Sequence, residues 1–364
     1  MIGQPYRVLV VDDSAFMRRY LKMIIETDPR LVVVDVARNG AEAVEKLEAL
    51  QPDVITLDIN MPGMDGLTAL SHIMTIRPTP VVMISSLTQD GALATLEALE
   101  LGAVDFVAKP SGTVSLDIEL LADEINLKVR TAARAKLRRP SVSRPALNRP
   151  RPAAQAIRRP LVPKFADAEG RFVAIGVSTG GPQTLLEILP QIPANFPAPV
   201  AIVQHIPANF TASLAKRLDS GCALPVQEAV NNRPLLPGVV YIAPGGTHLT
   251  VRRSVLGRGP VAHLSLEPKD RQFRPSVGVL FDSVAEEFGP AGIGVLLTGM
   301  GDDGADGMVR IKAAGGVTIA ESEETAIVFG MPREAILRGG ATFIVPNNRV
   351  ADCIVDALRK ETHQ

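Results

Sequence analysis

Residues 7–13 read RVLVVDD, a run of β-branched and other apolar residues that ends in two aspartates. Such a run is typical of a strand buried on both faces of a parallel sheet. Similar runs follow at 32–36, 54–57, 81–84 and 105–107, and helical patterns such as 16–26 and 41–50 separate them. Strands that alternate with helices predict βαβ units and a doubly wound parallel sheet of the flavodoxin-like kind.

The same alternation starts again after residue 170, with apolar runs at 172–177, 200–204, 293–297, 317–320 and 342–345. These runs predict a second doubly wound α/β domain with a Rossmann-like arrangement. Between residues 225 and 270, strand-like runs and turn glycines interrupt the pattern. We expect antiparallel hairpins there, inserted in the second sheet or lying on its edge.

The charge distribution divides the chain into three blocks. Residues 125–166 contain 12 Lys and Arg and no acidic residue, which gives +12. Residues 1–124 contain 9 basic and 19 acidic residues (−10), and residues 167–364 contain 17 and 20 (−3). Because Arg and Pro alternate through much of the basic block, it is predicted to be an extended linker. A basic arm that docks on an acidic surface is the alternative interpretation.

Length and cysteine content limit the class of protein. A chain of 364 residues suggests two domains, which we place at 1–124 and 167–364. Cys222 and Cys353 are isolated, which argues against a disulfide framework and a Cys-rich metal site. Because no apolar run reaches about 18 residues, we expect a soluble cytoplasmic protein without membrane insertion.

Polar residues follow four of the five N-terminal strands: Asp12 and Asp13, Asp58, Ser85 and Lys109. Parallel strands end at one edge of their sheet, so these side chains should converge. Three carboxylates together need a hard cation, and oxygen ligands suit Mg²⁺. A carboxylate beside that ion can attack a phosphoryl group, which Lys109 would neutralise and the Ser85 hydroxyl would contact.

With MPGMDG at 61–66 and the Lys109-Pro110 pair, this arrangement resembles the two-component receiver family. The resemblance implies that Asp58 accepts the phosphoryl group from a histidine kinase. It also implies that Asp12 and Asp13 hold Mg²⁺ together with Asp58, and that Phe106 occupies the aromatic switch position.

A second candidate site begins in FVAIGVSTGGP at 172–182, where a strand leads through a glycine turn into a helix. The turn could be a phosphate cradle, although it lacks the GxGxxG and GxxxxGK[ST] spacings. It could also be only a tight turn, or it could present Ser178 as a nucleophile. GVSTG formally matches G-x-S-x-G, but the usual hydrolase order would require His363 at the extreme end of the chain.

A different order of residues satisfies the chemistry. His205 follows the strand at 200–204, and Asp303 follows the strand at 293–297, so both should lie with Ser178 at one sheet edge. A histidine can accept the serine proton while a carboxylate fixes its tautomer. His248 is the nearest rival as the base, and spacing alone does not separate Asp302 from Asp303.

The motifs STGGP (178–182), QHIP (204–207), APGG (243–246), LTGMG (297–301) and VFGMPR (328–333) resemble the chemotaxis protein-glutamate methylesterase family. The resemblance implies a triad of Ser178, His205 and Asp303, with Thr179 and Met300 on the oxyanion side and no cofactor at this site. It implies a serine hydrolase that demethylates glutamate esters and deamidates glutamines on chemoreceptors during chemotaxis adaptation, under control of phosphorylation. Because two acidic domains are joined by a basic, extended tether, we also hypothesise that the unphosphorylated receiver covers the catalytic cleft and that phosphorylation of Asp58 releases it.

Two other classes of function compete with this interpretation. A DNA-binding regulator would need a basic output domain, whereas residues 167–364 carry −3, so no nucleic-acid partner is expected. A non-catalytic, phosphate-binding adaptor could use the glycine turn at 176–181. Reactivity of Ser178 towards a serine-directed probe would separate an adaptor from an esterase.

Overall fold

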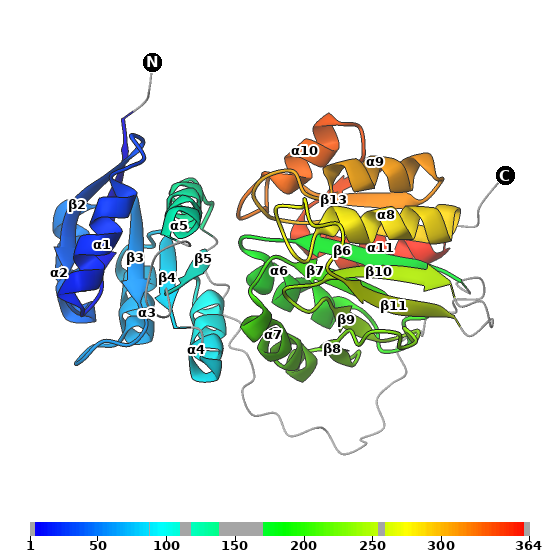
Figure 1. Cartoon of the computed structure of the whole chain (residues 1–364), viewed down its shortest axis with the longest axis horizontal. Helices are drawn as coiled ribbons and strands as arrows, with labels where there is room; N and C mark the ends of the chain where they lie inside the picture. Colours follow the sequence, from blue (N-terminus) through cyan, green and yellow to red (C-terminus); the bar gives the residue numbers. More distant parts are fainter. Residues whose placement is uncertain (1–3, 87, 110–117, 138–169, 254–258, 360–364) are drawn as a thin grey trace.

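The computed structural model describes residues 4–86, 88–109, 118–137, 170–253 and 259–359. Pro110, His363 and most of the predicted linker lie outside these ranges. Two α/β domains lie side by side, and each has a central parallel sheet covered by helices on both faces (Figure 1). The predicted fold class is therefore confirmed.

The N-terminal domain contains a five-stranded parallel sheet in the order β2-β1-β3-β4-β5. Its strands are β1 (Tyr6–Val11), β2 (Leu31–Ala37), β3 (Val54–Asp58), β4 (Val81–Ser85) and β5 (Asp105–Ala108). Its helices are α1 (Ala15–Ile25), α2 (Gly40–Leu50), α3 (Gly66–Ile76), α4 (Gln89–Glu100) and α5 (Ile118–Ala132). Each of the five predicted strands is present, to within two residues at its ends.

Helix α5 continues past residue 124, where the sequence placed the end of the first domain. Its Ile125, Val129 and Ala132 side chains are buried in one cluster with residues of β1 and α1. The first part of the basic block is therefore helical and packs on the first domain, because an amphipathic helix keeps its cationic side chains at the rim of the apolar face.

The C-terminal domain contains a seven-stranded sheet in the order β14-β13-β12-β6-β7-β9-β8, in which all neighbours are parallel. Its strands are β6 (Phe172–Val177), β7 (Val200–Gln204), β8 (Val226–Glu228), β9 (Val240–Ile242), β12 (Gly292–Leu296), β13 (Val317–Glu321) and β14 (Phe343–Val345). One face carries α6 (Gly181–Ile188), α7 (Ala208–Gly221) and α11 (Asn347–Arg359), and the other carries α8 (Val277–Phe288), α9 (Ala305–Ala313) and α10 (Met331–Leu337).

The prediction of hairpins within 225–270 is correct in only one part. β10 (His248–Arg253) and β11 (Pro260–Ser265) form a two-stranded antiparallel sheet of their own, which packs against α8. β8 and β9 instead add two parallel strands to the edge of the large sheet. Turn glycines mark where a strand ends, but the direction of the next strand depends on where the connecting segment crosses, and composition does not show this.

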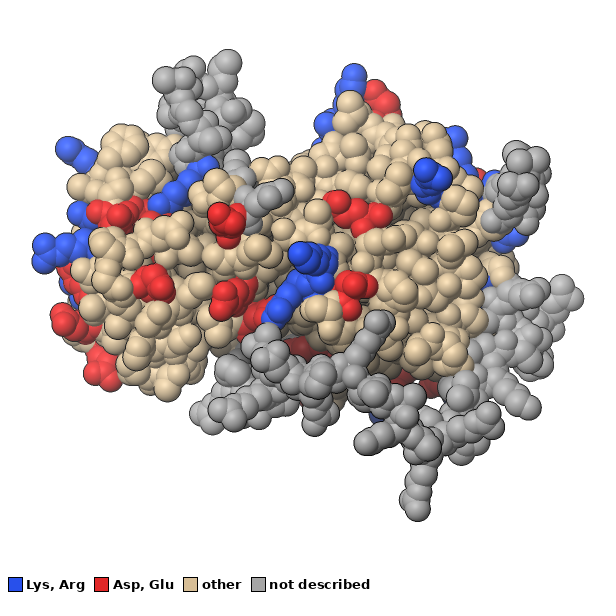
Figure 2. All heavy atoms as spheres, turned by 90° about the horizontal axis from the view of Figure 1, so that it is seen from below, with Lys and Arg blue, Asp and Glu red and all other residues tan. Residues whose placement is uncertain are grey.

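No helix among the described residues is long and apolar enough to cross a membrane. The face seen in Figure 2 carries described acidic and basic side chains that are intermixed rather than gathered into one basic area.

Candidate active site and phosphoacceptor site

Ser178 lies directly after β6, on the turn that leads into α6. The Ser178 carbonyl accepts hydrogen bonds from the Gly181 N–H at 2.8 Å and from Gln204 Nε2 at 2.9 Å. Gly180 has φ = 76°, a left-handed conformation that favours glycine. The glycines of the motif therefore form the turn, while Gln204, which is buried at the end of β7, holds the backbone of Ser178.

His205 and Asp303 lie beside Ser178 at the carboxyl edge of the sheet. His205 Nδ1 is 3.2 Å from Ser178 Oγ, and His205 Nε2 is 2.8 Å from Asp303 Oδ2. A carboxylate only accepts, so the proton lies on Nε2, and Nδ1 is left to accept the serine proton. The ring nitrogens are thus exchanged relative to the general Ser-His-Asp template, in which Nε2 faces the serine.

The structure separates the two tandem aspartates. Asp303 accepts hydrogen bonds from Ser276 Oγ (2.8 Å), the Val277 N–H (2.7 Å) and the Gly278 N–H (2.9 Å), at the start of α8. Burial opposes its charge, but the contacts with His205, Gly278 and Ser276 outweigh burial and lower the pKa of Asp303. Asp302 points outwards instead, to Arg338 at 2.5 Å.

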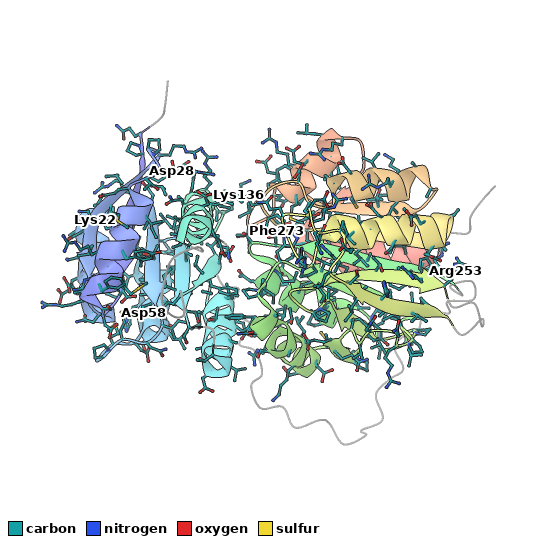
Figure 3. All side chains as sticks on the ribbon, in the orientation of Figure 1. Lys22, Asp28, Asp58, Lys136, Arg253 and Phe273 are labelled. Carbon is teal, nitrogen blue, oxygen red and sulfur yellow. The ribbon has the colours of Figure 1, made fainter. Side chains whose placement is uncertain are left out.

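Phe273 completes this site, and sequence reasoning missed it. Its ring is stacked on the His205 imidazole, with centroids 4.1 Å apart and planes 12° apart. Phe273 lies on the side of the catalytic domain that faces the N-terminal domain (Figure 3). The stacked ring covers one face of the His205 imidazole and restricts the orientation of its plane. A single Phe in a polar loop gives no signal of this in the sequence.

The second site lies at the carboxyl edge of the N-terminal sheet. Oxygen atoms of Asp12, Asp13 and Asp58 all lie within 4.8 Å of one another. Lys109 Nζ is 2.8 Å from Asp58 Oδ2 and 3.0 Å from Asp12 Oδ2. Burial raises the pKa of Asp58 although Lys109 acts in the opposite direction. Burial opposes the charge of Lys109, but the two nearby carboxylates, Asp58 and Asp12, outweigh burial and raise the pKa of Lys109.

This acidic cluster fits a divalent cation. Among the described residues, Asp12 Oδ2 is buried and receives no hydrogen bond of acceptable geometry, in spite of the nearby ammonium group. A cation between the three carboxylates would satisfy that oxygen and offset their mutual repulsion. Ser85, in contrast, is buried and turned towards α4, where Thr95 Oγ1 donates to Ser85 Oγ at 2.6 Å.

Two family models match the chain: "Response regulator receiver domain" over residues 8–120 and "CheB methylesterase" over residues 173–354. A protein-glutamate methylesterase/protein-glutamine glutaminase of Caldanaerobacter subterraneus is 54% identical over 355 residues, covering 97% of each chain. This chain belongs to the CheB methylesterase family. A second such relative, from Carboxydothermus hydrogenoformans, is 53% identical over 97% of this chain and 99% of its own length.

The solved catalytic domain of the Thermotoga maritima CheB methylesterase is similar to the C-terminal domain. It is 43% identical with a TM-score of 0.50, and the match covers 51% of this chain and 98% of that chain. The chain is thus a hydrolase of the protein-glutamate methylesterase/protein-glutamine glutaminase class, and it carries a receiver domain with a divalent metal site.

In this methylesterase the receiver domain packs against the residues beside Ser178. Thr179 Oγ1 donates a buried hydrogen bond to Asp105 Oδ2 of the receiver at 2.6 Å. Thr131 of α5 contacts Met300 Sδ at 2.5 Å. The receiver therefore contacts both residues that the family resemblance placed on the oxyanion side.

The remaining contacts between the domains surround this point. Phe106 of β5 packs on Phe210 of α7 with ring centroids 4.5 Å apart, and both rings are buried. Glu100 of α4 forms a bidentate ion pair with Arg217 of α7. Lys136 extends from the receiver to the Glu323 carbonyl at 3.0 Å, and Figure 3 shows it between the domains. The predicted switch residue Phe106 thus lies in the domain interface.

Proposed function

We propose that Ser178, His205 and Asp303 are the catalytic triad of a chemoreceptor methylesterase whose activity depends on phosphorylation of Asp58. The observation that carries the proposal is the continuous hydrogen-bonded arrangement from Ser178 Oγ through both His205 nitrogens to Asp303. The arrangement lies at the carboxyl edge of a parallel sheet, where α/β enzymes place their reacting groups.

The reaction follows from this geometry. As Ser178 Oγ attacks the γ-carbonyl of a methylated glutamate, His205 Nδ1 accepts its proton and Asp303 stabilises the resulting imidazolium. The C–O bond to methoxide then breaks, and His205 returns the proton so that methanol leaves. Water, deprotonated by the same imidazole, attacks the acyl-enzyme and releases glutamate and Ser178. A glutamine substrate loses ammonia by the same steps.

We assign the stabilisation of the oxyanion to backbone N–H groups at Thr179 and Met300. The neighbouring N–H groups are already used, since Ser178 donates to the Thr298 carbonyl at 3.0 Å and Thr298 donates to Glu321 at 2.8 Å. Removing one hydrogen-bond donor from an oxyanion-binding site of this kind typically raises the free energy of the transition state by about 3–4 kcal/mol.

In the receiver, Asp58 is the proposed phosphoacceptor, and Asp12, Asp13 and Asp58 would hold Mg²⁺. When bound, the ion would neutralise phosphoryl oxygens. Lys109 is placed to pair with the same group, while the Ser85 hydroxyl would need to turn from Thr95 to contact it. A histidine kinase is the proposed phosphodonor. We place the protein in the cytoplasm, in keeping with its two free cysteines.

The proposed control is occlusion, supported by the contact of Asp105 with Thr179. While that contact holds, the receiver covers the turn that a receptor helix must reach. Phosphorylation of Asp58 would rearrange β5 and α4 and release Phe106 and Glu100 from α7. Those two residues are among the receiver's contacts with α7, so their movement would loosen the interface that covers the cleft.

The test measures methanol release from methylated receptor by the full chain, with Mg²⁺ and with or without a small-molecule phosphodonor. We expect the donor to accelerate the wild type, to leave Asp58→Asn at its basal rate, and to leave Ser178→Ala inactive throughout. An active Ser178→Ala enzyme would refute the triad, and a donor response in Asp58→Asn would refute the switch.

A further inference from the structure

His248, the first residue of β10, is fully buried and uses both ring nitrogens. The backbone N–H of Ser276 lies 3.2 Å from His248 Nδ1, and the carbonyl of Pro268 lies 3.1 Å from His248 Nε2. A backbone N–H can only donate and a carbonyl can only accept. His248 is therefore neutral, with its proton on Nε2.

The two partners of His248 are at opposite ends of the segment that connects β11 to α8. Pro268 lies near the start of this segment, and Ser276 is the N-cap of α8. A third hydrogen bond, from the Gly246 N–H to the Arg274 carbonyl at 3.0 Å, holds the segment from the same side. His248 thus fixes the two ends of one loop, which we call the clamp loop (residues 268–276).

The clamp loop carries two of the groups that contact the triad. Ser276 donates to Asp303, and Phe273 is stacked on His205. A continuous series of contacts therefore runs from His248 to Ser276 (3.2 Å), to Asp303 (2.8 Å) and to His205 (2.8 Å). Displacement of Ser276 would also move the Val277 and Gly278 N–H groups, which supply the other two hydrogen bonds to Asp303 from α8.

We propose that His248 is a positioning residue for the esterase reaction: its neutral imidazole holds the clamp loop so that Asp303 and Phe273 orient His205. This inference rests on the proposed triad and gives a role to a histidine that does not touch the reacting atoms. Catalysis is sensitive to such positioning, because a misplacement of about 1 Å can lower a rate by about 10²-fold.

The surroundings of His248 keep it neutral. Burial lowers its pKa, the Pro268 carbonyl raises it, Arg274 and Arg271 of the clamp loop lower it, and Asp303 raises it. The net direction is downwards. Protonation of His248 would place a hydrogen on Nδ1, facing the Ser276 N–H. The hydrogen bond between Ser276 and His248 would therefore be lost only at acidic pH.

Two substitutions separate positioning from a general loss of structure. His248→Leu removes both hydrogen bonds, whereas His248→Asn keeps an acceptor near Nδ1 for the Ser276 N–H. His263→Leu is the matched control, because His263 lies on the partner strand β11 of the same hairpin, away from the clamp loop. All variants are full-length, with thermal unfolding checked to lie above the assay temperature.

The first readout is the rate at which a fluorophosphonate probe phosphonylates Ser178 with loss of fluoride. The second is kcat and KM for methanol release from methylated receptor with the phosphodonor present. We expect His248→Leu to lose about 10²-fold in phosphonylation rate and in kcat, with KM within about twofold of the wild type. The rates of His248→Asn should be at least about tenfold higher than those of His248→Leu. In the pH profile of kcat, His248→Asn should lack one ionisation on the acidic side that the wild type shows.

Equal rates for His248→Leu and His263→Leu would overturn the proposal, as would equal losses in the Leu and Asn variants. Ser178→Ala keeps this failure distinct from a failure of the proposed function. An inactive Ser178→Ala enzyme beside a fully active His248→Leu enzyme would refute only the clamp, whereas an active Ser178→Ala enzyme would refute the triad itself.

Discussion

The ion pair between Glu100 and Arg217 joins the receiver to the catalytic domain without touching either reacting site. Replacing either residue with alanine is predicted to raise the basal esterase rate, because the pair stabilises only the closed arrangement. The hydrogen bonds that Arg217 donates to Glu100 raise the pKa of Arg217, although burial opposes this. The Arg217 side chain is 35% exposed and the Glu100 side chain is 19% exposed, so solvent screens much of their attraction.

The expected size follows from that exposure. A partly exposed, bidentate pair contributes about 1 kcal/mol, at the upper end for surface pairs. Because 1.4 kcal/mol corresponds to a factor of 10, the equilibrium between closed and open forms should shift about fivefold. If the closed form dominates before phosphorylation, the basal rate of Glu100→Ala rises by about the same factor, and the phosphorylated rate does not change.

The assay is methanol release from methylated receptor by the full chain without a phosphodonor. The charge swap of Glu100→Arg with Arg217→Glu restores the attraction and should return the rate towards that of the wild type. Lys216→Ala, an exposed neighbour on α7, is the matched control and should leave the rate unchanged. Basal rates of the single variants within about 1.5-fold of the wild type would contradict occlusion through this interface.

Three further predictions concern single groups. Gly299→Ala would place a Cβ 2.8 Å from Ser178 Cβ, so the acylation rate of Ser178 should fall at least tenfold; an unchanged rate would contradict the packing of this turn. The pKa of Asp303 is lowered on folding, so its carboxylate stabilises the fold above pH 3.8 and loses that effect as the pH falls further. The difference in thermal midpoint between wild type and Asp303→Asn should therefore shrink below pH 3.8, and a constant difference would count against it. Burial raises the pKa of the Cys222 thiol to about 12, so iodoacetamide at pH 8 should modify Cys222 only after unfolding, as peptide mass analysis would show.

Much of this architecture could be predicted because parallel strands require apolar runs and place their polar endings at one edge. Ser178, His205 and the Asp302–Asp303 pair come from three different strand ends, and that rule brought them together. The choice of Asp303 over Asp302 came from the family resemblance. The rule failed for β8 and β9, whose direction depends on a crossover that turn residues do not encode. It was also silent on which ring nitrogen of His205 faces Ser178, since this depends on side-chain orientation.

Contacts between distant segments were the least predictable. Thr179 was expected on the oxyanion side, but nothing in the sequence pairs it with Asp105 of β5, and only the docking of two domains joins them. His248 was a rival for the base because a glycine-rich motif precedes it, whereas the structure buries its ring beneath the clamp loop. The role of Phe273 depends on the same loop, whose path no local pattern defines.

The direction in which the receiver faces the catalytic domain has a chemical consequence. Asp58 is the last residue of β3 and pairs with Ile84 of β4. Asp105 is the first residue of β5 and pairs with Val82 of β4, two residues before Ile84. The two aspartates are therefore two strands apart and at different heights in the sheet. A phosphorylated aspartate is a mixed anhydride, and an activated serine is a good nucleophile towards such an acyl group. In the docked arrangement the receiver therefore presents Asp105, and not the proposed phosphoacceptor Asp58, to the turn that carries the proposed nucleophile Ser178.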